Sequence, residues 1–225
     1  MERVPEPELM DAGHQAAAYA AADFSLSDQA VIERLAQLFP AGLGARVVDL
    51  GCGPGNISFR LAAWDPAAQV LGIDGAGAML ELAEQELQRR RRLSPDLPGR
   101  LRFQRCRLPD PQLAGGFSAV VSNSLLHHLH EPAVLWSTVR QLGGAGACVY
   151  IKDLRRPASP EAAEDLRRLH MAGAPAVLQH DYVASLRAAF TPEEVRGQLR
   201  AAGLAGSLQV APEGDRYLEV WGRLD

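Results

Sequence analysis

The stretch from Val47 to Gly55, Val-Val-Asp-Leu-Gly-Cys-Gly-Pro-Gly, decides the fold of this chain. Its apolar residues Val47, Val48 and Leu50 suit a strand that is buried on both faces of a parallel sheet. Three glycines follow at alternate positions, and a residue without a Cβ permits a tight turn. Such a turn brings backbone N–H groups and a helix N-terminus close to a ligand. The stretch therefore predicts a strand that leads into a ligand-binding loop.

The spacing within this loop separates two kinds of nucleotide-binding protein. Dinucleotide-binding folds carry the pattern G-x-G-x-x-G, whereas this chain has G-x-G-x-G, with Asn56 at the place of the third fingerprint glycine. Asp49 also stands two residues before the first glycine. With its neighbours, the stretch resembles the first motif of class I S-adenosylmethionine-dependent methyltransferases. The resemblance implies that Asp49 helps to bind the cofactor's ammonium group through water. The cofactor contacts that it implies in the loop are Gly51, Cys52, Gly53 and Asn56.

Length, composition and charge fit one globular domain and narrow the classes of function. The chain has 225 residues, of which 47% are hydrophobic, enough for a substantial core. A net charge of −4 and a pI near 5.9 are unlike the basic domains that bind nucleic acid. No apolar stretch approaches the ~18 residues of a membrane span, and no signal peptide is recognisable. We therefore expect a cytoplasmic protein with no nucleic-acid partner and no membrane span.

Strand-like and helix-like segments alternate through the middle of the chain, which is typical of a parallel α/β sheet. The predicted strands are 46–50, 69–73, 101–105, 119–122 and 147–151, with helices at 55–63, 76–91 and 132–142. Two helices are predicted before the first strand, at 8–22 and at 27–39, the second with Ser27 as its N-cap. Residues 155–190 have helical periodicity, and Thr191-Pro-Glu-Glu opens a helix with a capping box. Strands at 208–211 and 217–222 close the chain as an antiparallel pair.

Class I methyltransferases have a mostly parallel sheet that ends in such a pair, so the resemblance gives the expected fold class. It is α/β, with a Rossmann-like seven-stranded sheet in the order 3-2-1-4-5-7-6, the last strand antiparallel, N-terminal helices and a helical insertion after strand five. We expect a single domain over residues 1–225. Its parts are an N-terminal helical cap (1–43), a cofactor-binding core (44–154), a helical lid insertion (155–190), and a closing helix and hairpin (191–225).

An acid at the end of the second strand is the predicted ribose-binding residue. Asp74 lies about 20 residues beyond the glycine loop, a spacing that lets a carboxylate accept hydrogen bonds from both ribose hydroxyls of an adenosine. The same residue, followed by Gly75, also suits a helix N-cap, and both roles can hold at once. Met79 stands where the resembled family sets an apolar side chain against the adenine; ordinary helix core is the alternative.

The turn after the third strand departs from the family pattern. Residues 101–109 read Leu-Arg-Phe-Gln-Arg-Cys-Arg-Leu-Pro, and the family usually has an acid that binds the adenine amino group shortly before Leu-Pro. Cys106 and Arg107 stand there instead. Side-chain recognition of adenine is therefore not expected at this point, although backbone groups of Cys106 and Arg107 can supply the contacts.

The segment 120–132, Val-Val-Ser-Asn-Ser-Leu-Leu-His-His-Leu-His-Glu-Pro, resembles the fourth-strand motif of small-molecule methyltransferases, especially the ubiquinone and menaquinone C-methyltransferases. Asn123 and Ser124 follow the strand at the edge where open α/β sheets bind ligands, so we expect them to line the sulfonium and the substrate entrance. His127 and His128 are candidates for a general base, whereas the resemblance implies that they orient the loop. With His130 they suggest a metal, but the motif offers no cysteine or acid at zinc spacing. No metal site is predicted, and Cys52, Cys106 and Cys148 lack C-x-x-C spacing.

Further candidates lie where the family builds its substrate chamber. Asp153 ends the fifth strand, where its carboxylate either contacts substrate, with a possible catalytic role, or pairs with Arg155 or Arg156. In this fold the N-terminal helix and the insertion after strand five lie over the cofactor. The candidates for the chamber wall are Tyr19, which we also assign to the cofactor, and His180, Asp181 and Tyr182. Plain helix packing is the alternative for all four.

The sequence thus favours methyl transfer from S-adenosyl-L-methionine to a small-molecule metabolite, with S-adenosyl-L-homocysteine as the second product. A non-catalytic S-adenosylmethionine-binding protein is the first alternative. An NAD-dependent oxidoreductase is the second, but the chain's single lysine, Lys152, at the end of strand five makes a hydride-transfer site hard to build. The sequence leaves open whether the acceptor atom is oxygen, nitrogen, sulfur or carbon.

Overall fold

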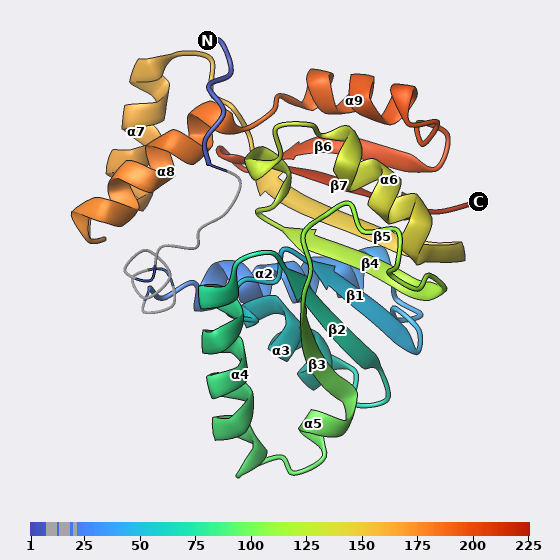
Figure 1. The fold of residues 1–225 in the computed structure, drawn as a ribbon. Coiled ribbons are helices and arrows are strands. Elements are labelled where there is room, and N and C mark those ends of the chain that lie inside the picture. The colour runs from blue at the N-terminus through green and yellow to red at the C-terminus, as the bar shows by residue number, and fades with distance from the viewer. Residues whose placement is uncertain (8–12, 14–18, 20–21) are drawn as a thin grey trace.

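The structure is a computed structural model that describes residues 1–7, 13, 19 and 22–225. One sheet crosses the described part of the chain, with helices on both of its faces (Figure 1). Its strands are β1 (Arg46–Leu50), β2 (Gln69–Asp74), β3 (Leu101–Arg105), β4 (Phe117–Asn123), β5 (Gly143–Leu154), β6 (Leu208–Glu213) and β7 (Tyr217–Arg223). The helices are α2 (Ser25–Leu38), α3 (Asn56–Trp64), α4 (Gly77–Arg91), α5 (Leu97–Arg100), α6 (Ala133–Leu142), α7 (Pro160–His170), α8 (Ala176–Ala188) and α9 (Pro192–Ala201), with a short 3-10 turn, η1 (Leu126–His128).

The sheet has the predicted topology. Its order is β3-β2-β1-β4-β5-β7-β6, and the pairs from β3 through β5 are all parallel. β7 runs antiparallel to both β5 and β6. β1 and β4 are neighbours in the sheet although β2 and β3 separate them in sequence, so the chain reverses its direction of progress across the sheet at β1. Ligands of open α/β sheets bind at the carboxyl ends of the strands beside such a switch point.

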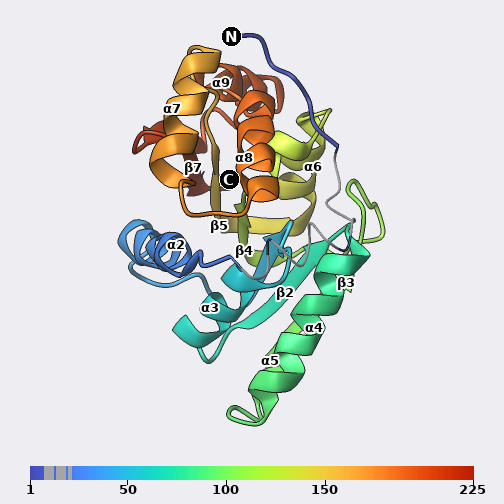
Figure 2. The same ribbon diagram turned by 90° about the vertical axis from the view of Figure 1, so that its left-hand side faces the viewer.

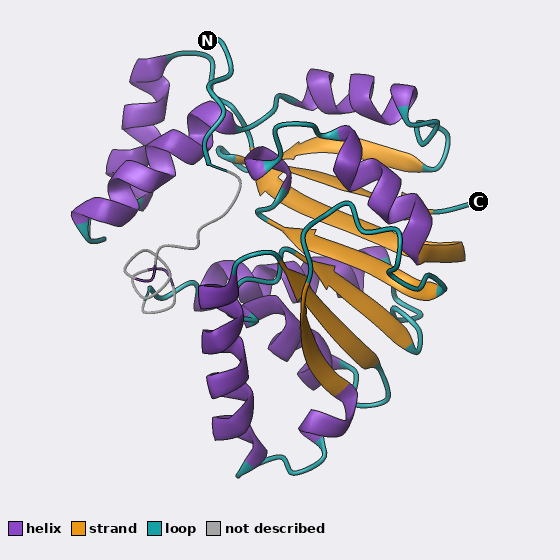
Figure 3. Cartoon of the chain, in the orientation of Figure 1, coloured by secondary structure: helices purple, strands orange, loops and turns teal. Residues whose placement is uncertain are grey.

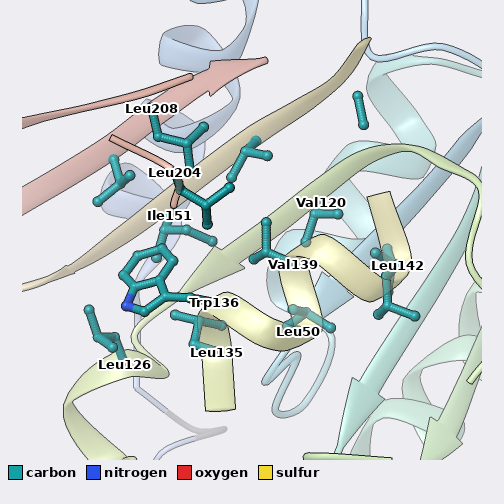
Figure 4. Packing of buried hydrophobic residues seen from close by; sticks show 14 of the residues in the cluster. Leu50, Val120, Leu126, Leu135, Trp136, Val139, Leu142, Ile151, Leu204 and Leu208 are labelled. Carbon is teal, nitrogen blue, oxygen red and sulfur yellow. The ribbon is translucent and has the colours of Figure 1, made fainter. Parts of the chain in front are cut away.

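Alternate residues of the strands supply the two halves of the core. Leu50 and Val120 point to one face, where they pack with Trp136 of α6 (Figure 4). Val48 and Leu199 of α9 belong to the same cluster. The intervening residues of the same strands face α2, α3 and α5; this second cluster includes Val47, Ala119, Val31, Ile57 and Leu97. Burial on both faces explains why these strands read as continuous apolar runs. The sheet therefore holds its strand ends in fixed positions.

The helices α7 and α8 lie together past the carboxyl ends of the central strands, as Figure 3 shows by element type. The first residues of the chain run along α8 (Figure 2). Val4 donates its backbone N–H to the Arg187 carbonyl oxygen, and the Arg3 guanidinium donates to the carbonyl oxygens of Ala188, His127 and Leu129. Residues 1–7 thus form an N-terminal strap that joins α8 to the η1 turn. No described helix is long and apolar enough to cross a membrane.

Most predicted elements are confirmed within a few residues, and one predicted cap is wrong. α9 begins with the predicted capping box between Thr191 and Glu194. α2 begins at Ser25 rather than Ser27, because the Asp23 carboxylate accepts the Ser25 N–H at 2.9 Å while the Ser27 hydroxyl donates to the Phe24 carbonyl. The predicted helix at 8–22 falls almost entirely outside the described residues. The short helix α5 was not predicted.

Candidate active site

A cavity of about 730 Å³ opens at the carboxyl ends of β1, β2, β4 and β5. It is enclosed by helices α7 and α8, the glycine loop and the start of α2. Its volume is typical of a site for a small molecule. Every residue that the sequence assigns to the cofactor lines this one cavity. They are Tyr19, Asp49, Gly51, Cys52, Gly53, Asn56, Asp74, Gly75, Met79, Cys106, Arg107, Asn123 and Ser124. The structure thus brings these residues together, and the role of each remains a prediction.

The glycine loop needs its glycines for two different reasons. Gly51, Gly53 and Gly55 have φ values of 68°, 53° and 88°, a region that other residues enter only with strain. A Cβ on Gly51 would lie 2.9 Å from Leu125, and one on Gly55 would lie 2.7 Å from Phe103, so these two glycines also permit close packing. A Cβ on Gly53 would meet nothing within 4 Å. Gly53 therefore presents bare backbone toward the cavity.

Asp74 holds the loop and the next helix together. One carboxylate oxygen accepts the Gly53 N–H and the other accepts the Ala76 N–H, each at 2.8 Å. The second bond lies immediately before α4, so Asp74 acts at the helix start, as one of its two predicted roles requires. The carboxylate also lines the cavity, where its predicted second role is to bind the ribose.

Asp49 lies deeper in the same wall. Its side chain is 1% exposed, and it accepts a hydrogen bond of 2.6 Å from the Ser58 hydroxyl. Burial raises the pKa of Asp49 to about 7, the nearby Asp74 adds to the effect, and the Ser58 bond opposes it. Asp49 can therefore exchange a proton near neutral pH, and a cationic ligand group beside it would favour the ionised form.

The expected adenine end is apolar, and one backbone donor there, the N–H of Cys106, is engaged within the sheet. Met79 and Ala76 are buried with Tyr19 packed against them, and the Tyr19 and Phe24 rings lie 4.8 Å apart. The Cys106 N–H donates to the Asp74 carbonyl oxygen at 2.9 Å, as part of the extension of β3 beside β2. That donor is therefore occupied by the sheet and is not available to adenine. The burial of Met79 agrees with the core alternative as well as with an adenine contact.

The loop after β4 has an unusual backbone. Ser124 has a φ of 62°, the one positive φ outside glycine in the described chain. Its N–H donates to the Lys152 carbonyl oxygen at 2.8 Å, which ties the loop to β5. A serine held in this conformation costs about 1 kcal/mol or more. Such strain is common at binding sites, and Asn123 and Ser124 both line the cavity as expected.

His127 joins Asp153 and the N-terminal strap. Its Nδ1 lies 2.5 Å from an Asp153 oxygen, and its Nε2 lies 3.4 Å from Glu6. Burial acts to lower the pKa of His127, but Asp153 and Glu6 outweigh it, so that pKa is raised. Asp153 also accepts the backbone N–H groups of Leu126 and Leu154 at 2.6 and 2.7 Å. These bonds orient the loop, as the family resemblance implies for the histidines.

Two predictions about Asp153 and its strand need correction. Asp153 does not pair with Arg155 or Arg156, which bind the Gly214 and Asp215 carbonyls and Glu194 instead. It is 1% exposed and lies behind His127, so it is not among the described residues that line the cavity. Successive strand residues point to opposite faces. The neighbouring Lys152 therefore reaches the cavity, and this pattern could have identified it.

The substrate side of the cavity carries cationic and phenolic groups. Lys152 is 5% exposed, its pKa is lowered by burial, and its ammonium lies 3.6 Å from Glu213 and 4.3 Å from the Tyr217 ring centroid. The Arg216 guanidinium stacks over Tyr217 at 4.8 Å, and no described carboxylate forms an ion pair with it. Both cations line the cavity. The sequence analysis missed Arg216 and Tyr217 because only the antiparallel pairing of β7 with β5 brings them there.

Three residues of the insertion were predicted for the chamber wall, and two reach it. Asp181 and Tyr182 line the cavity together with Leu178 and Ser185, one face of α8. His180 does not: it is exposed and borders a separate surface hollow between α7 and α8. Residues three and four apart share a helix face, whereas adjacent residues point in different directions. His180 therefore points away from the face on which Asp181 lies. Tyr19, the fourth candidate, lines the cavity near Met79.

Comparisons with known proteins agree with this geometry. Residues 47–146 match a family model described as a methyltransferase domain. Trans-aconitate 2-methyltransferase of Deinococcus radiodurans is 36% identical over 113 residues, which are 48% of this chain and 39% of the relative. Malonyl-[acyl-carrier protein] O-methyltransferase of Legionella pneumophila is 30% identical over 112 residues, 48% of this chain and 36% of the relative. The matched region thus spans less than two fifths of either relative.

Solved structures share the fold over nearly the whole chain. An S-adenosylmethionine-dependent methyltransferase from Aquifex aeolicus aligns with a TM-score of 0.64 and 15% identity, over 93% of this chain and 98% of the other. The plantazolicin methyltransferase BpumL, in complex with a pentazolic desmethylPZN analog and SAH, aligns with a TM-score of 0.68 and 13% identity, over 93% and 89%. The fold of this chain is therefore that of the class I methyltransferases.

Proposed function

We propose that this chain, whose core is a class I S-adenosylmethionine-dependent methyltransferase domain, transfers a methyl group to a small molecule bound beneath its lid. One observation carries the proposal: a single cavity extends from the glycine loop and Asp74 to the Lys152 and Arg216 side chains. Donor and acceptor can therefore lie in the same enclosure. Bound S-adenosylmethionine supplies an electrophilic methyl group on a sulfonium, and the protein supplies the geometry of attack.

The chain's own residues fit that cofactor. Bare backbone at Gly53 admits a close ligand, and the Asp74 carboxylate, which lines the cavity, is of the residue type that accepts hydrogen bonds from ribose hydroxyls. The Asp49 carboxyl, with its pKa near 7, suits a cationic ammonium group. Met79 and the Tyr19 ring offer apolar surface to an adenine. We assign these residues to the cofactor on that basis.

We further propose that the acceptor carries negative charge. Lys152 and Arg216 bring two cations to the side of the cavity away from Asp74, beside the Tyr217 and Tyr182 rings. A buried cation is costly unless a counter-charge accompanies it. Lys152 has one in Glu213, whose side chain is partly exposed at 3.6 Å, and an anionic acceptor would add a second within the cavity. The names of two relatives, for trans-aconitate and malonyl-[acyl-carrier protein], point to acidic or acyl substrates in those proteins.

Acceleration then rests on proximity and orientation, which can lower a barrier by about 7–11 kcal/mol when two reactants are held in line. His127 is held between Asp153 and Glu6, so it orients the loop rather than abstracts a proton. Ser124 and Asn123 close the cavity at the strand end between the cofactor loop and Lys152. A carboxylate acceptor is already ionised near neutral pH and needs no general base.

The test is transfer of labelled methyl from S-adenosylmethionine to a panel of small carboxylic acids and their matching primary amides. We expect turnover of at least one acid, and at least tenfold lower kcat/KM for its amide. Lys152→Met should lower kcat/KM for that acid at least tenfold, because a charge-assisted hydrogen bond contributes about 1.5–3 kcal/mol. His180→Gln, outside the cavity, serves as the matched control.

The other outcomes decide between the alternatives. S-adenosylmethionine binding without turnover of any acceptor would favour a non-catalytic binding protein. NAD binding in its place would contradict the proposal outright. Equal turnover of the acid and its amide would support methyl transfer but contradict the proposal that the acceptor carries negative charge.

A further inference from the structure

Three potential ligand atoms converge where the N-terminal strap crosses η1. Glu6 Oε1 lies 3.4 Å from His127 Nε2 and 3.2 Å from His128 Nδ1. All three donor atoms lie within 4.8 Å of one another. The Glu6 side chain is 12% exposed, and those of His127 and His128 are 3% and 14% exposed. The group is therefore largely shielded from solvent.

The hydrogen bonds around Glu6, His127 and His128 leave too few protons for every contact among these three side chains to have a donor. His127 uses Nδ1 toward Asp153, which fixes Nε2 as the nitrogen that faces Glu6. His128 donates to the Pro7 carbonyl oxygen, and its buried Nδ1 has no hydrogen-bond partner among the described residues. Since Pro7 offers only an acceptor, the Nε2 of His128 carries the proton and Nδ1 presents a lone pair to the Glu6 carboxylate.

A single proton cannot satisfy these atoms. A proton on His127 Nε2 can be donated to Glu6, but His128 Nδ1 then still faces an acceptor at 3.2 Å. Two acceptors turned toward each other in a buried place are unfavourable, because each has lost water without gaining a donor. A cation that all three atoms coordinate removes the conflict.

We propose that Glu6, His127 and His128 bind one divalent transition-metal ion of the zinc type. Zinc bonds of about 2.0–2.2 Å to nitrogen and oxygen, in tetrahedral arrangement, place neighbouring ligand atoms roughly 3.4 Å apart, close to the two observed distances of 3.2 and 3.4 Å. One carboxylate and two imidazoles are also a donor set that zinc prefers. The proposal does not depend on methyl transfer.

The surroundings have the features of a metal site's outer shell. Asp153 accepts from His127 and the Pro7 carbonyl accepts from His128, the arrangement that orients ligating histidines and fixes their tautomers. The Ser185 hydroxyl donates to Glu6 Oε1 at 3.0 Å, and His130 Nε2 lies 2.8 Å from the Glu6 carbonyl oxygen. Three protein ligands leave one tetrahedral position open. His127 and His128 both line the cavity, so the proposed ion would lie at its wall.

The sequence around the histidines predicts no metal, because it offers no acid at zinc spacing. The acid that completes the group, Glu6, lies more than a hundred residues away in sequence. Only the path of the N-terminal strap along α8 brings it to η1. His130, the third histidine of the motif, takes no ligand position and instead lies against the Glu6 backbone.

The test measures metal binding by the full chain with any affinity tag removed, because a histidine tag binds the same ions. After treatment with chelator and desalting, the protein is titrated with Zn2+ in a calorimeter and with Co2+ in a visible spectrometer. We expect one ion per chain and the intense visible bands of tetrahedral Co2+. His128→Gln and Glu6→Gln should each raise the Kd for Zn2+ at least tenfold, whereas the exposed His180→Gln should not change it.

Thermal unfolding of every variant without metal shows whether it folds. Equal Zn2+ affinity in wild type, His128→Gln and Glu6→Gln would overturn the proposal, as would the absence of stoichiometric binding by the wild type. Titration of the same samples with S-adenosylhomocysteine reports on the cofactor site separately. Failure of the metal proposal and failure of the proposed function therefore give different results.

Discussion

At the scale of single residues, Asp49 couples protonation to both stability and cofactor binding. Its pKa in the folded chain is about 7, against an ordinary value of 3.8, chiefly because of burial. At a pH between these two pKa values, the Asp49 carboxyl therefore keeps its proton in the folded chain and loses it in the unfolded chain. Asp49 favours folding most below about pH 4, and this contribution is lost as the pH rises toward 7.

We predict that Asp49→Asn removes this pH dependence while keeping an acceptor for the Ser58 hydroxyl. Urea unfolding should show the wild type losing about 2 kcal/mol relative to the variant between pH 5 and pH 8. Glu33→Gln, at an exposed carboxyl, is the control. Parallel stability curves for wild type and Asp49→Asn would show that the Asp49 proton has no part in folding.

The same residue predicts a pH-dependent affinity. If the cofactor's ammonium binds beside Asp49, binding requires the ionised carboxylate. The Kd of the wild type should then fall as the pH rises from 6 to 7.5, and Asp49→Asn should bind more weakly with little pH dependence. Equilibrium dialysis with labelled S-adenosylmethionine measures both. A Kd that is constant over this range in the wild type would place the ammonium elsewhere.

Asp74 has two roles, and one substitution separates them only in part. Asp74→Ala should raise the Kd for S-adenosylmethionine at least tenfold, through the loss of charge-assisted bonds to the ribose. It should also lower the stability of the ligand-free chain by about 1–2 kcal/mol, because the Gly53 and Ala76 N–H groups lose their acceptor. Dialysis and urea unfolding measure the two effects. Lost stability with unchanged affinity would leave Asp74 as a cap alone.

Residue patterns identified the glycine-loop side of the cavity more completely than its opposite side. Asp49, Gly53 and Asp74 lie within one strand–loop–strand unit, so a local motif identified them. Lys152 and Arg216 meet only through the pairing of β5 with β7. Glu6 meets His127 only through the strap. No local sequence pattern encodes contacts of this kind. Asp153 was predicted to contact the substrate, whereas its neighbour on the strand, Lys152, faces the cavity.

At the scale of elements, an ion pair between a half-buried arginine and a buried glutamate attaches α2 to the sheet. Arg34 of α2 donates to both carboxylate oxygens of Glu219 on β7, with its Nε at 2.9 and 3.2 Å, and Glu219 is 3% exposed. We predict that Arg34→Met lowers the free energy of unfolding by about 2 kcal/mol, because it leaves a buried carboxylate without its partner.

Arg168→Met is the matched control, since Arg168 pairs with Asp165 on the surface, where both side chains are more than 60% exposed. Exposed pairs contribute about 0–1 kcal/mol, so this variant should unfold almost as the wild type does. Urea unfolding compares the two. An Arg34→Met curve that superimposes on the control would show that the α2 contact is held by its apolar face alone.

Elements were predicted well where two signals agreed. β1 matches its predicted range because an apolar run ends at the glycine loop, and β3 matches because apolar and polar residues alternate up to the following turn. β4 and β5 are longer than predicted, since their ends pair with neighbouring strands through residues of weak strand preference such as Gly143. The start of α2 was misplaced because both Asp23 and Ser27 are plausible caps, and only the fold decides between them.

At the scale of the whole molecule, ligand binding should stabilise the fold by mass action. The cavity joins the core, the lid and the first part of the chain, so a bound ligand contacts elements that otherwise separate on unfolding. At 100 times its Kd, a ligand adds about 2.7 kcal/mol. For a chain of this size, that corresponds to a rise in Tm of about 5–10 °C.

We expect this rise with S-adenosylhomocysteine in differential scanning fluorimetry and a much smaller one for Asp74→Ala at the same ligand concentration. NAD at equal concentration is the control and should leave the Tm unchanged. The overall topology that underlies this expectation was implied by the family resemblance, and the alternation of strands and helices agrees with it. The path of residues 1–7 did not, since nothing in their composition directs them to α8.

The central claim is that the cavity is built for S-adenosylmethionine, and calorimetric titration of the wild-type chain tests it most directly. The account predicts that S-adenosylhomocysteine binds with saturable heat at one site per chain and that NAD gives no saturable heat under the same conditions. Saturable binding of NAD, with none for S-adenosylhomocysteine, would contradict it.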